Sequence, residues 1–293
     1  MLYADNYIRP PNEAGSVIIR LTRGCAWGRC LFCGIYEAMG TPFRVPPKEE
    51  ILEDVQRARQ VYGPEARRIF LGDADPISID PDNFIEITRA VRAAFPHCER
   101  ITCYGRMATA WKQRRHLGRF AEAGLTRIHA GLETGSNDLL RFHKKGISQA
   151  RMIDAGRAVA TSGLQLSLYV LLGLGGSDRW EEHVAETVKV LNAIRPQFVR
   201  FRRLWVHPHC ALARAAEAGE FLPQTPEGTV IETRDMLAGL DFPCHVECMH
   251  ANNYVNFECR LPEDREEVVG GINDFLSRSD EEKDRVYSVC SRI

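Results

Sequence analysis

The sequence predicts an α/β fold: a partial (β/α)6 TIM-like barrel with an α-rich C-terminal extension. Two observations support this prediction. Short apolar runs alternate six times with amphipathic segments, at a spacing of about 35 residues that suits a barrel or an open wound sheet. Unusual residues follow the apolar runs, as they do where sites form at the carboxyl ends of parallel strands. Consecutive strands joined by helices form a parallel sheet with right-handed crossovers.

The predicted strands are short and rich in β-branched and aromatic residues, which favour extended structure. The first begins with Val17, Ile18 and Ile19. In chain order, the strands are expected at residues 17–22, in the apolar part of RRIFLGDADP (67–76), and at residues 100–104, 127–132, 165–172 and 197–206.

The predicted helices carry apolar residues at spacings of three and four. In residues 48–63 these are Ile51, Val55 and Ala58, and Gly63 with the following proline ends the helix. The remaining helices of the barrel are expected at residues 82–95, 108–123, 148–162, 180–194 and 208–218.

The alternation ends near residue 221. Two further helices are expected at 229–240 and 263–276, separated by a non-helical segment, PCHVECMHANNYVNFECR (243–260). We therefore divide the chain into an N-terminal lead-in (1–16), a barrel (17–220) and an extension that covers the barrel (221–293).

The composition is that of an ordinary soluble protein, with 44% hydrophobic and 26% charged residues. The net charge of -1 indicates no nucleic-acid partner and no membrane surface. We find no signal-peptide core and expect a cytoplasmic protein. Ten cysteines in such a chain favour metal or redox chemistry over a disulfide framework.

The most informative stretch is LTRGCAWGRCLFCG, which follows the first strand and places Cys25, Cys30 and Cys33 in a C-x4-C-x2-C spacing. Three thiolates on a glycine-containing loop can converge on one metal centre and leave a coordination position open. The alternatives are three ordinary buried cysteines or a zinc knuckle with a fourth ligand from elsewhere. We favour an open iron–sulfur cluster.

Polar or glycine residues follow the other strands, so we expect them on the same rim as the cysteines. They are Gly72, Asp73, Ala74 and Asp75 after the second strand, Tyr104 and Arg106 after the third, Glu133 after the fourth, Gly173 to Gly176 after the fifth, and His207 and His209 after the sixth.

In these motifs and their order, the chain resembles the radical S-adenosylmethionine (radical SAM) superfamily. The superfamily's common signature is C-x3-C-x2-C with an aromatic before the last cysteine. Phe32 matches that aromatic, while the first gap here is one residue longer. The resemblance implies a [4Fe-4S] cluster on the three cysteines and S-adenosylmethionine (SAM) as cofactor.

The resemblance also implies SAM contacts at residues 32, 72–75, 104, 106, 133, 171 and 173. Asp75 stands where the family has an acid that holds the methionine amino group, and a carboxylate suits that ammonium. Glu133 matches the ribose contact, and Leu171 and Gly173 match the adenine contact. The alternatives are a solvated acidic turn for Asp75 and a helix-start acid or a partner of Arg106 for Glu133. We interpret His129 as an interior histidine rather than a ligand.

By resemblance, the reduced cluster cleaves SAM to a 5′-deoxyadenosyl radical, which abstracts hydrogen from a small-molecule or peptide substrate. An electron donor such as flavodoxin or ferredoxin is then required. Alternatives are cleavage of another SAM bond, giving aminocarboxypropyl transfer, or a non-catalytic iron–sulfur or metal-binding protein. Few residues precede the first strand, so we expect no cobalamin domain ahead of it.

Two further sets of residues carry hypotheses of their own. Cys244, Cys248 and Cys259 could bind a second cluster or metal, or simply be small apolar residues. Three arginines of the sixth strand, with nearby histidines, could line a pocket for an anionic substrate, or lie on the surface. The residues are Arg200, Arg202, Arg203, His207, His209 and His250.

Overall fold

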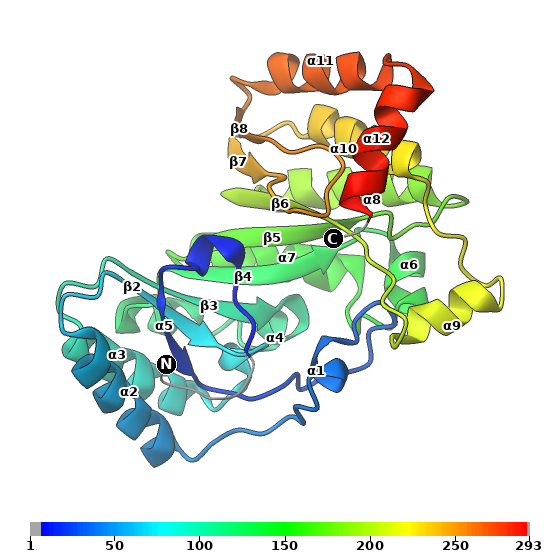
Figure 1. Ribbon diagram of the computed structural model, residues 1–293. Helices are drawn as coiled ribbons and strands as arrows, with labels where there is room; N and C mark the ends of the chain where they lie inside the picture. Colours follow the sequence, from blue (N-terminus) through cyan, green and yellow to red (C-terminus); the bar gives the residue numbers. More distant parts are fainter. Residues whose placement is uncertain (1–6, 292–293) are drawn as a thin grey trace. The chain divides into compact units, whose positions relative to one another are not determined.

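The computed structural model of the protein describes residues 7–291 (Figure 1). Its strands follow one another in one sheet in the order of the sequence, and all neighbours with a described register are parallel except β7 and β8. The strands are β1 (Val17–Arg20), β2 (Arg68–Gly72), β3 (Arg100–Arg106), β4 (Arg127–Glu133), β5 (Gln165–Leu172), β6 (Phe198–Arg203), β7 (Cys244–Glu247) and β8 (Glu258–Leu261).

Helices separate the first six strands, as the alternation predicts; two further helices lie between β6 and β7, and two follow β8. In chain order they are α1 (Ile35–Ala38), α2 (Lys48–Tyr62), α3 (Pro81–Ala94), α4 (Met107–Lys112), α5 (Leu117–Ala123), α6 (Asn137–Phe142), α7 (Gln149–Thr161), α8 (Trp180–Ile194), α9 (Ala211–Glu217), α10 (Pro226–Gly239), α11 (Arg265–Leu276) and α12 (Asp280–Cys290). Two short 3-10 turns are formed by Pro11–Glu13 and Pro76–Ser78.

The chain divides into two compact units, which we describe separately. Unit 1 comprises Met1–Gly28, Ile35–Ala130 and Asp154–Leu166. In it β2 lies between β1 and β3, with Ile69 beside both Val17 and Ile101. Helices α3 and α5 meet through the rings of Phe84 and Phe120, whose centroids lie 4.5 Å apart. The buried strands and this helix pair form the core of the unit.

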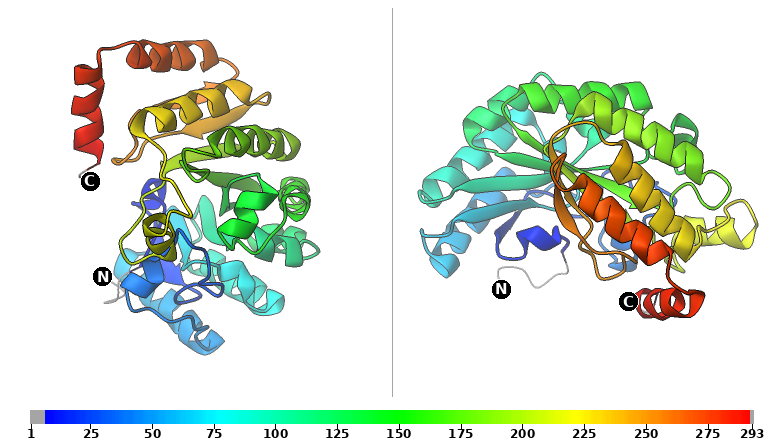
Figure 2. Two further views of the ribbon diagram at one scale, coloured as in Figure 1. Left: turned by 90° about the vertical axis from the view of Figure 1, so that its right-hand side faces the viewer. Right: turned by 90° about the horizontal axis from the view of Figure 1, so that it is seen from above.

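Unit 2 comprises Arg29–Gly34, Gly131–Ile153 and Ser167–Ile293. Here β5, β6 and β7 are parallel and β8 turns back beside β7. Figure 2 shows α8 and α10 along one face of these strands. Alternate residues point to opposite faces, so Leu168 and Phe201 share the apolar face while Arg200 lies on the other.

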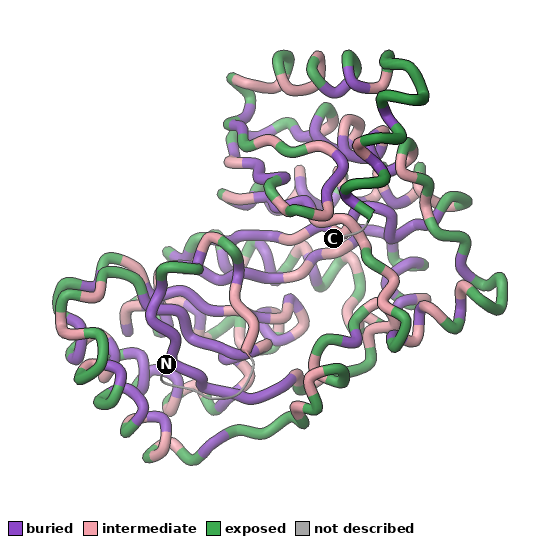
Figure 3. Tube along the Cα trace, in the orientation of Figure 1, coloured by how far each residue is buried: buried purple, intermediate pink, exposed green. Residues whose placement is uncertain are grey.

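Burial is most continuous along the strands (Figure 3). All four residues of β1 are buried, and so are four of the five in β2. In contrast, α2 buries one side only, through Ile51, Val55 and Ala58, which are the residues that predicted it. Within residues 7–291, no helix combines the length and the apolar composition needed to cross a membrane.

The segment at 243–260 is non-helical, as predicted, but it contains β7 and most of β8, two strands that the sequence did not predict. β7 extends the parallel sheet beside β6, with Val199 next to Val246. Its four residues alternate apolar and polar, but four residues are too few to distinguish a strand from a loop by periodicity. The C-terminal region therefore supplies part of the sheet as well as the expected helices.

The single helix predicted at 108–123 is also wrong: it is two helices, α4 and α5. Arg114 and Arg115 are exposed at the break, and the backbone turns there through a hydrogen bond from His116 N to Gln113 O (2.7 Å). No apolar side chain anchors this turn, and Leu117 then returns the chain to the core.

Candidate active site

The three loop cysteines differ from the remaining cysteines in their exposure. None of the ten cysteines forms a disulfide, and only three lie outside the core: Cys25 and Cys30 are half-buried and Cys33 is exposed. A free cysteine is ordinarily among the most buried residues. These three are therefore less buried than the other seven, and their role as cluster ligands stays a prediction.

Unit 1 holds the first half of the cysteine loop. Gly24 has φ +66°, and a Cβ added there would lie 2.8 Å from the carbonyl oxygen of Thr41, so only glycine fits. The residue before it, Arg23, exchanges backbone hydrogen bonds of 2.9 and 3.1 Å with Arg44. These contacts fix the backbone that leads into Cys25.

Unit 2 holds the second half of the loop. The N–H of Leu31 donates to His143 O (3.1 Å), and its carbonyl accepts from Leu212 N (2.9 Å). Leu31 and Phe32 also pack against a small apolar cluster made of Cys210, Leu212, Ala215 and Phe221. Cys30 and Cys33 are thus carried by a segment anchored to α9 and to the end of α6.

Glu133 ends β4 and folds back over its own strand. Its φ of +66° is uncommon for a residue other than glycine. Its Oε1 accepts a hydrogen bond from Lys145 Nζ (2.7 Å), and both side chains are almost buried. Lys145 Nζ also lies 5.7 Å from the centre of the Phe32 ring. The residue predicted to contact ribose is therefore linked to the cysteine segment through Lys145, which the sequence did not indicate.

The loop after β2 carries two buried carboxylates. Asp73 binds the guanidinium of Arg20 with N–O distances of 3.0 and 2.6 Å. Asp75 accepts from Arg106 N (3.0 Å) and from Thr109 Oγ1 (2.6 Å). Burial raises the pKa of Asp75 to about 6, although both hydrogen bonds act to lower it. Asp75 therefore ties this loop to the β3–α4 junction, and its contact with a methionine ammonium stays a prediction.

The end of β3 reaches the first half of the cysteine loop. Tyr104 stacks edge-on against Phe70, with ring centroids 5.1 Å apart. The guanidinium carbon of Arg106 lies 4.9 Å from the ring centre of Trp27, between Cys25 and Cys30 in sequence. The predicted positions 75, 104 and 106 thus lie in one neighbourhood of unit 1.

The turn after β5 is held by a residue that the sequence did not identify. The N–H of Gly173, whose φ is +84°, donates to Glu232 Oε2 (2.6 Å), and Gln224 donates to Oε1 (2.9 Å). Burial raises the pKa of Glu232 to about 7, although both hydrogen bonds lower it. No local pattern in α10 marks Glu232, because its partner is 59 positions away.

Two buried histidines form hydrogen bonds with backbone carbonyls of the same turn. His183 Nε2 lies 3.0 Å from Leu171 O, and His143 Nε2 lies 2.9 Å from Leu174 O. Burial lowers the pKa of each to about 4. Neutral imidazoles therefore donate to the carbonyls on both sides of Gly173. In unit 1, His129 is buried as expected, with Nε2 3.2 Å from Glu13 Oε1.

The late cysteines lie on the β7–β8 hairpin and just after β7. The register pairs Val246 with Cys259, so Cys244, Cys248 and Cys259 share one buried face. Burial raises the pKa of Cys244 and Cys248 to about 12 and that of Cys259 to about 11. Across residues 7–291, no group of three or more His, Cys, Asp or Glu side chains could hold a metal ion. The second metal site stays a prediction.

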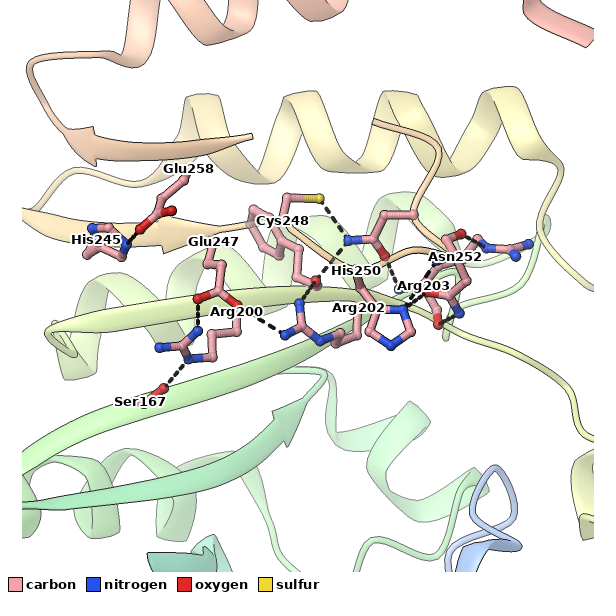
Figure 4. A network of polar contacts seen from close by, with 12 residues as sticks. Ser167, Arg200, Arg202, Arg203, His245, Glu247, Cys248, His250, Asn252 and Glu258 are labelled. Atoms are coloured by element: carbon pink, nitrogen blue, oxygen red, sulfur yellow. Dashed lines mark hydrogen bonds and ion pairs between the residues drawn. The ribbon is translucent and has the colours of Figure 1, made fainter. Parts of the chain in front are cut away.

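The sixth strand places its arginines on both faces, as expected (Figure 4). Arg200 and Arg202 bind Glu247 of β7. Arg203, on the opposite face, donates to Asn252 O (2.5 Å) and to Tyr254 Oη (2.6 Å). Two of the predicted pocket histidines, His207 and His209, lie outside this network. They follow β6 in the loop before α9, where their rings are 5.1 Å apart.

In donor type the three loop cysteines suit an iron–sulfur cluster, but among residues 7–291 they do not form a group that could hold a metal ion, and Cys25 lies in unit 1 while Cys30 and Cys33 lie in unit 2. Cysteine thiolates are soft ligands, and a set of three would leave one iron of a cluster open to a further ligand. The turns at residues 72–75 and 171–173 are each held by buried hydrogen bonds. Their contacts with SAM stay a prediction.

Comparison with known proteins assigns the chain to a family. It matches the Radical SAM superfamily over residues 19–188, more than half of its length. It is 23% identical over 211 residues to an uncharacterized methyltransferase of Pyrococcus horikoshii, covering 70% of this chain and 43% of that protein. The chain thus spans less than half of that relative.

Solved structures share the fold. Coproporphyrinogen III oxidase (HemN) from Escherichia coli is 14% identical with a TM-score of 0.59, covering 76% of this chain and 51% of that chain. The methyltransferase TsrM from Kitasatospora setae, with cobalamin and a [4Fe-4S] cluster bound, is 19% identical with a TM-score of 0.56, covering 72% and 41%. On the family match and this fold, the chain belongs to the radical SAM superfamily of enzymes.

Proposed function

We propose that the protein binds a [4Fe-4S] cluster through Cys25, Cys30 and Cys33, cleaves SAM reductively, and uses the 5′-deoxyadenosyl radical to take hydrogen from a small molecule or peptide. The observation that supports this proposal is that these three cysteines, which lie within the region matching the superfamily, are half-buried or exposed, while the other seven are buried. The bound cluster supplies the electron that breaks the sulfonium C–S bond, and a flavodoxin- or ferredoxin-like protein supplies that electron in turn.

The chain's own residues orient SAM in this proposal. The backbone of residues 72–75 and the Asp75 carboxylate face the methionine ammonium. With a pKa near 6, Asp75 is ionised at neutral pH and can form a charge-assisted pair. Glu133 binds the ribose, and Leu171 packs on adenine beside the turn at Gly173. Phe32, Tyr104 and Arg106 complete the site.

The test is anaerobic reconstitution with iron and sulfide, followed by SAM and dithionite and chromatography of the nucleosides. We expect 5′-deoxyadenosine from the native protein and none above background from Cys30→Ala, because that variant lacks one cluster ligand. Cys98→Ala, which removes a buried cysteine in unit 1, is the matched control and should retain iron and activity.

Other products would identify other reactions. Methylthioadenosine without 5′-deoxyadenosine would show cleavage of a different SAM bond. S-adenosylhomocysteine would show methyl transfer, the activity in the name of the Pyrococcus relative. A cluster-loaded protein that forms none of these nucleosides would contradict the enzymatic proposal and favour a cluster carrier.

A further inference from the structure

The polar face of unit 2 carries two arginines that share one carboxylate (Figure 4). Arg200 and Arg202 are two positions apart on β6, so both side chains lie on the same side of the strand. Glu247 stands beside Arg200 in the register of β6 with β7. One of its oxygens binds Arg200 and the other binds Arg202 Nη2 at 3.1 Å. Arg200 Nε also donates to Ser167 (2.8 Å).

Arg200, Arg202 and Glu247 together carry one net positive charge, and their side chains have little contact with solvent. The side chains of Arg200, Glu247 and Arg202 are 3%, 12% and 11% exposed. Two guanidinium groups against one carboxylate leave one positive charge, and an uncompensated buried charge is costly. The next pair along this face is His245 with Glu258 (2.7 Å). The Glu258 carboxylate stands beside Glu247 in the register of β7 with β8, but its side chain is 58% exposed, so water screens it and it offsets the buried positive charge only in part.

The positive charge of the arginines also shifts the pKa of two side chains, Glu247 and His250. Burial acts to raise the pKa of Glu247, but the charges of and hydrogen bonds from Arg200 and Arg202 lower it below its ordinary value. Burial lowers the pKa of His250, and the charges of Arg202 and Arg203 lower it further. A cation is thus disfavoured beside Arg202, and an anion is favoured.

Arg202 also has the hydrogen-bonding capacity to bind an anion. A guanidinium carries five N–H groups, and the contacts of Arg202 with described residues use Nη1, to Phe201 O (3.0 Å), and Nη2, to Glu247. Its planar group lies 5.5 Å from the ring centre of Tyr169, which limits its orientations. A fixed guanidinium suits the two oxygens of a carboxylate.

The position of Arg202 connects it with the proposed chemistry. The register places Arg202 beside Leu171, the residue proposed to contact adenine, at the carboxyl end of the strands. We propose that Arg202, supported by Arg200 and Glu247, binds a carboxylate of the substrate, so that the substrate is a carboxylate-bearing molecule. This rests on the proposed function. A single excess charge matches a monoanionic carboxylate better than a phosphate group, which carries about -1.5 to -2.

The test measures anion binding without SAM or reductant, so that it does not depend on cleavage. The melting temperature of the cluster-reconstituted protein is followed against sodium acetate, with sodium chloride keeping the ionic strength constant. We expect a saturable increase in Tm, because a ligand that binds the folded state stabilises it. Inorganic phosphate should bind more weakly than acetate, and tighter phosphate binding would contradict the carboxylate assignment.

Two variants give opposite expected shifts. Arg202→Gln should weaken acetate binding about tenfold or more, because charge-assisted bonds are lost. Glu247→Gln should tighten it, because the amide oxygen still accepts a hydrogen bond from the arginines while the negative charge that competes with acetate is removed. Arg203→Gln is the matched control: it removes the same charge from the other face of the strand and should leave the acetate Kd within about twofold. If Arg202→Gln does not fold, Arg202→Lys should fold and bind acetate less tightly than the native protein.

The outcomes separate this inference from the proposed function. If acetate has the same effect as chloride on a protein that forms 5′-deoxyadenosine, the carboxylate site is wrong and the radical chemistry stands. Equal acetate binding by the native protein and Arg202→Gln would likewise overturn it. If acetate binding depends on Arg202 but no nucleoside forms, the anion site stands and the radical proposal fails.

Discussion

A glycine at residue 131 allows Glu133 to lie over its own strand. A Cβ at Gly131 would be 1.8 Å from Glu133 Oε1 and 2.9 Å from Lys145 Nζ. With a larger residue at position 131, the Glu133 carboxylate could not keep this position. Glu133, whose backbone is left-handed, would then lose its ion pair with Lys145. An outlier held by specific contacts is a common feature of ligand sites. The geometry of the proposed ribose contact therefore depends on residue 131.

We predict that Gly131→Ala weakens SAM binding about tenfold, equivalent to about 1.4 kcal/mol, by displacing Glu133. Equilibrium dialysis of SAM with the reconstituted protein would measure this change. The control is Gly118→Ala in α5, where an added Cβ meets nothing within 4 Å; it should leave SAM binding unchanged and stabilise the helix slightly. Unchanged binding in Gly131→Ala would exclude Glu133 as a SAM contact.

At the scale of elements, the turn after β5 depends on α10. Glu232 is fully buried and holds the N–H of Gly173, while His143 and His183 hold carbonyls on either side. An acid with a pKa near 7 in the folded protein and near 4.5 in the unfolded chain keeps a proton that the unfolded chain releases. Stability therefore falls as the pH rises from about 4.5 to about 7.

We predict that Glu232→Gln removes this loss, which amounts to about 3 kcal/mol for a pKa shift of this size. The melting temperature of the variant relative to the native protein should increase between pH 5 and pH 8. Glu217→Gln, on the exposed side of α9, is the control and should follow the native pH dependence. Parallel curves for Glu232→Gln and the native protein would contradict the raised pKa.

At the scale of the whole molecule, the C-terminal region belongs to the sheet of unit 2. β7 pairs with the first half of β6, from Phe198 beside His245 to Arg200 beside Glu247. α12 also contacts this region, since Arg203 donates to Cys290 O (2.9 Å) and Tyr254 packs against Tyr287. The domain boundary predicted at residue 220 would separate β6 from its partner strand and Arg200 from its counter-ion.

We predict that a chain ending at residue 220 does not fold cooperatively. Loss of Glu247 alone leaves buried guanidinium groups unpaired, at a cost of about 3 to 5 kcal/mol, and β6 becomes an open edge. A chain ending at residue 278, which lacks only α12, should still unfold cooperatively with a lower Tm. Urea unfolding followed by circular dichroism would measure the cooperativity and stability of both shortened chains. A 1–220 fragment that unfolds cooperatively would contradict this prediction and show that residues 221–293 form a separate domain.

The sequence by itself determined the strand–helix alternation and the position of the cysteine loop. Both depend on local physics: Ile51, Val55 and Ala58 share a helix face because of the helical period, and Cys25, Cys30 and Cys33 are close in the chain. Gly24 could likewise be interpreted from its place in a tight loop. The first six strands follow this prediction because each is long enough, or apolar enough, to be distinguished from a loop.

Only the tertiary structure decided which side chains support the candidate site. Glu232 reaches Gly173 across 59 positions, Glu247 reaches Arg200 across 47, and Thr109 reaches Asp75 across 34. Such contacts have no period in the sequence, because they arise when strands and helices bring distant residues together. β7 belongs to the same class: four alternating residues become a strand only because β6 offers an edge.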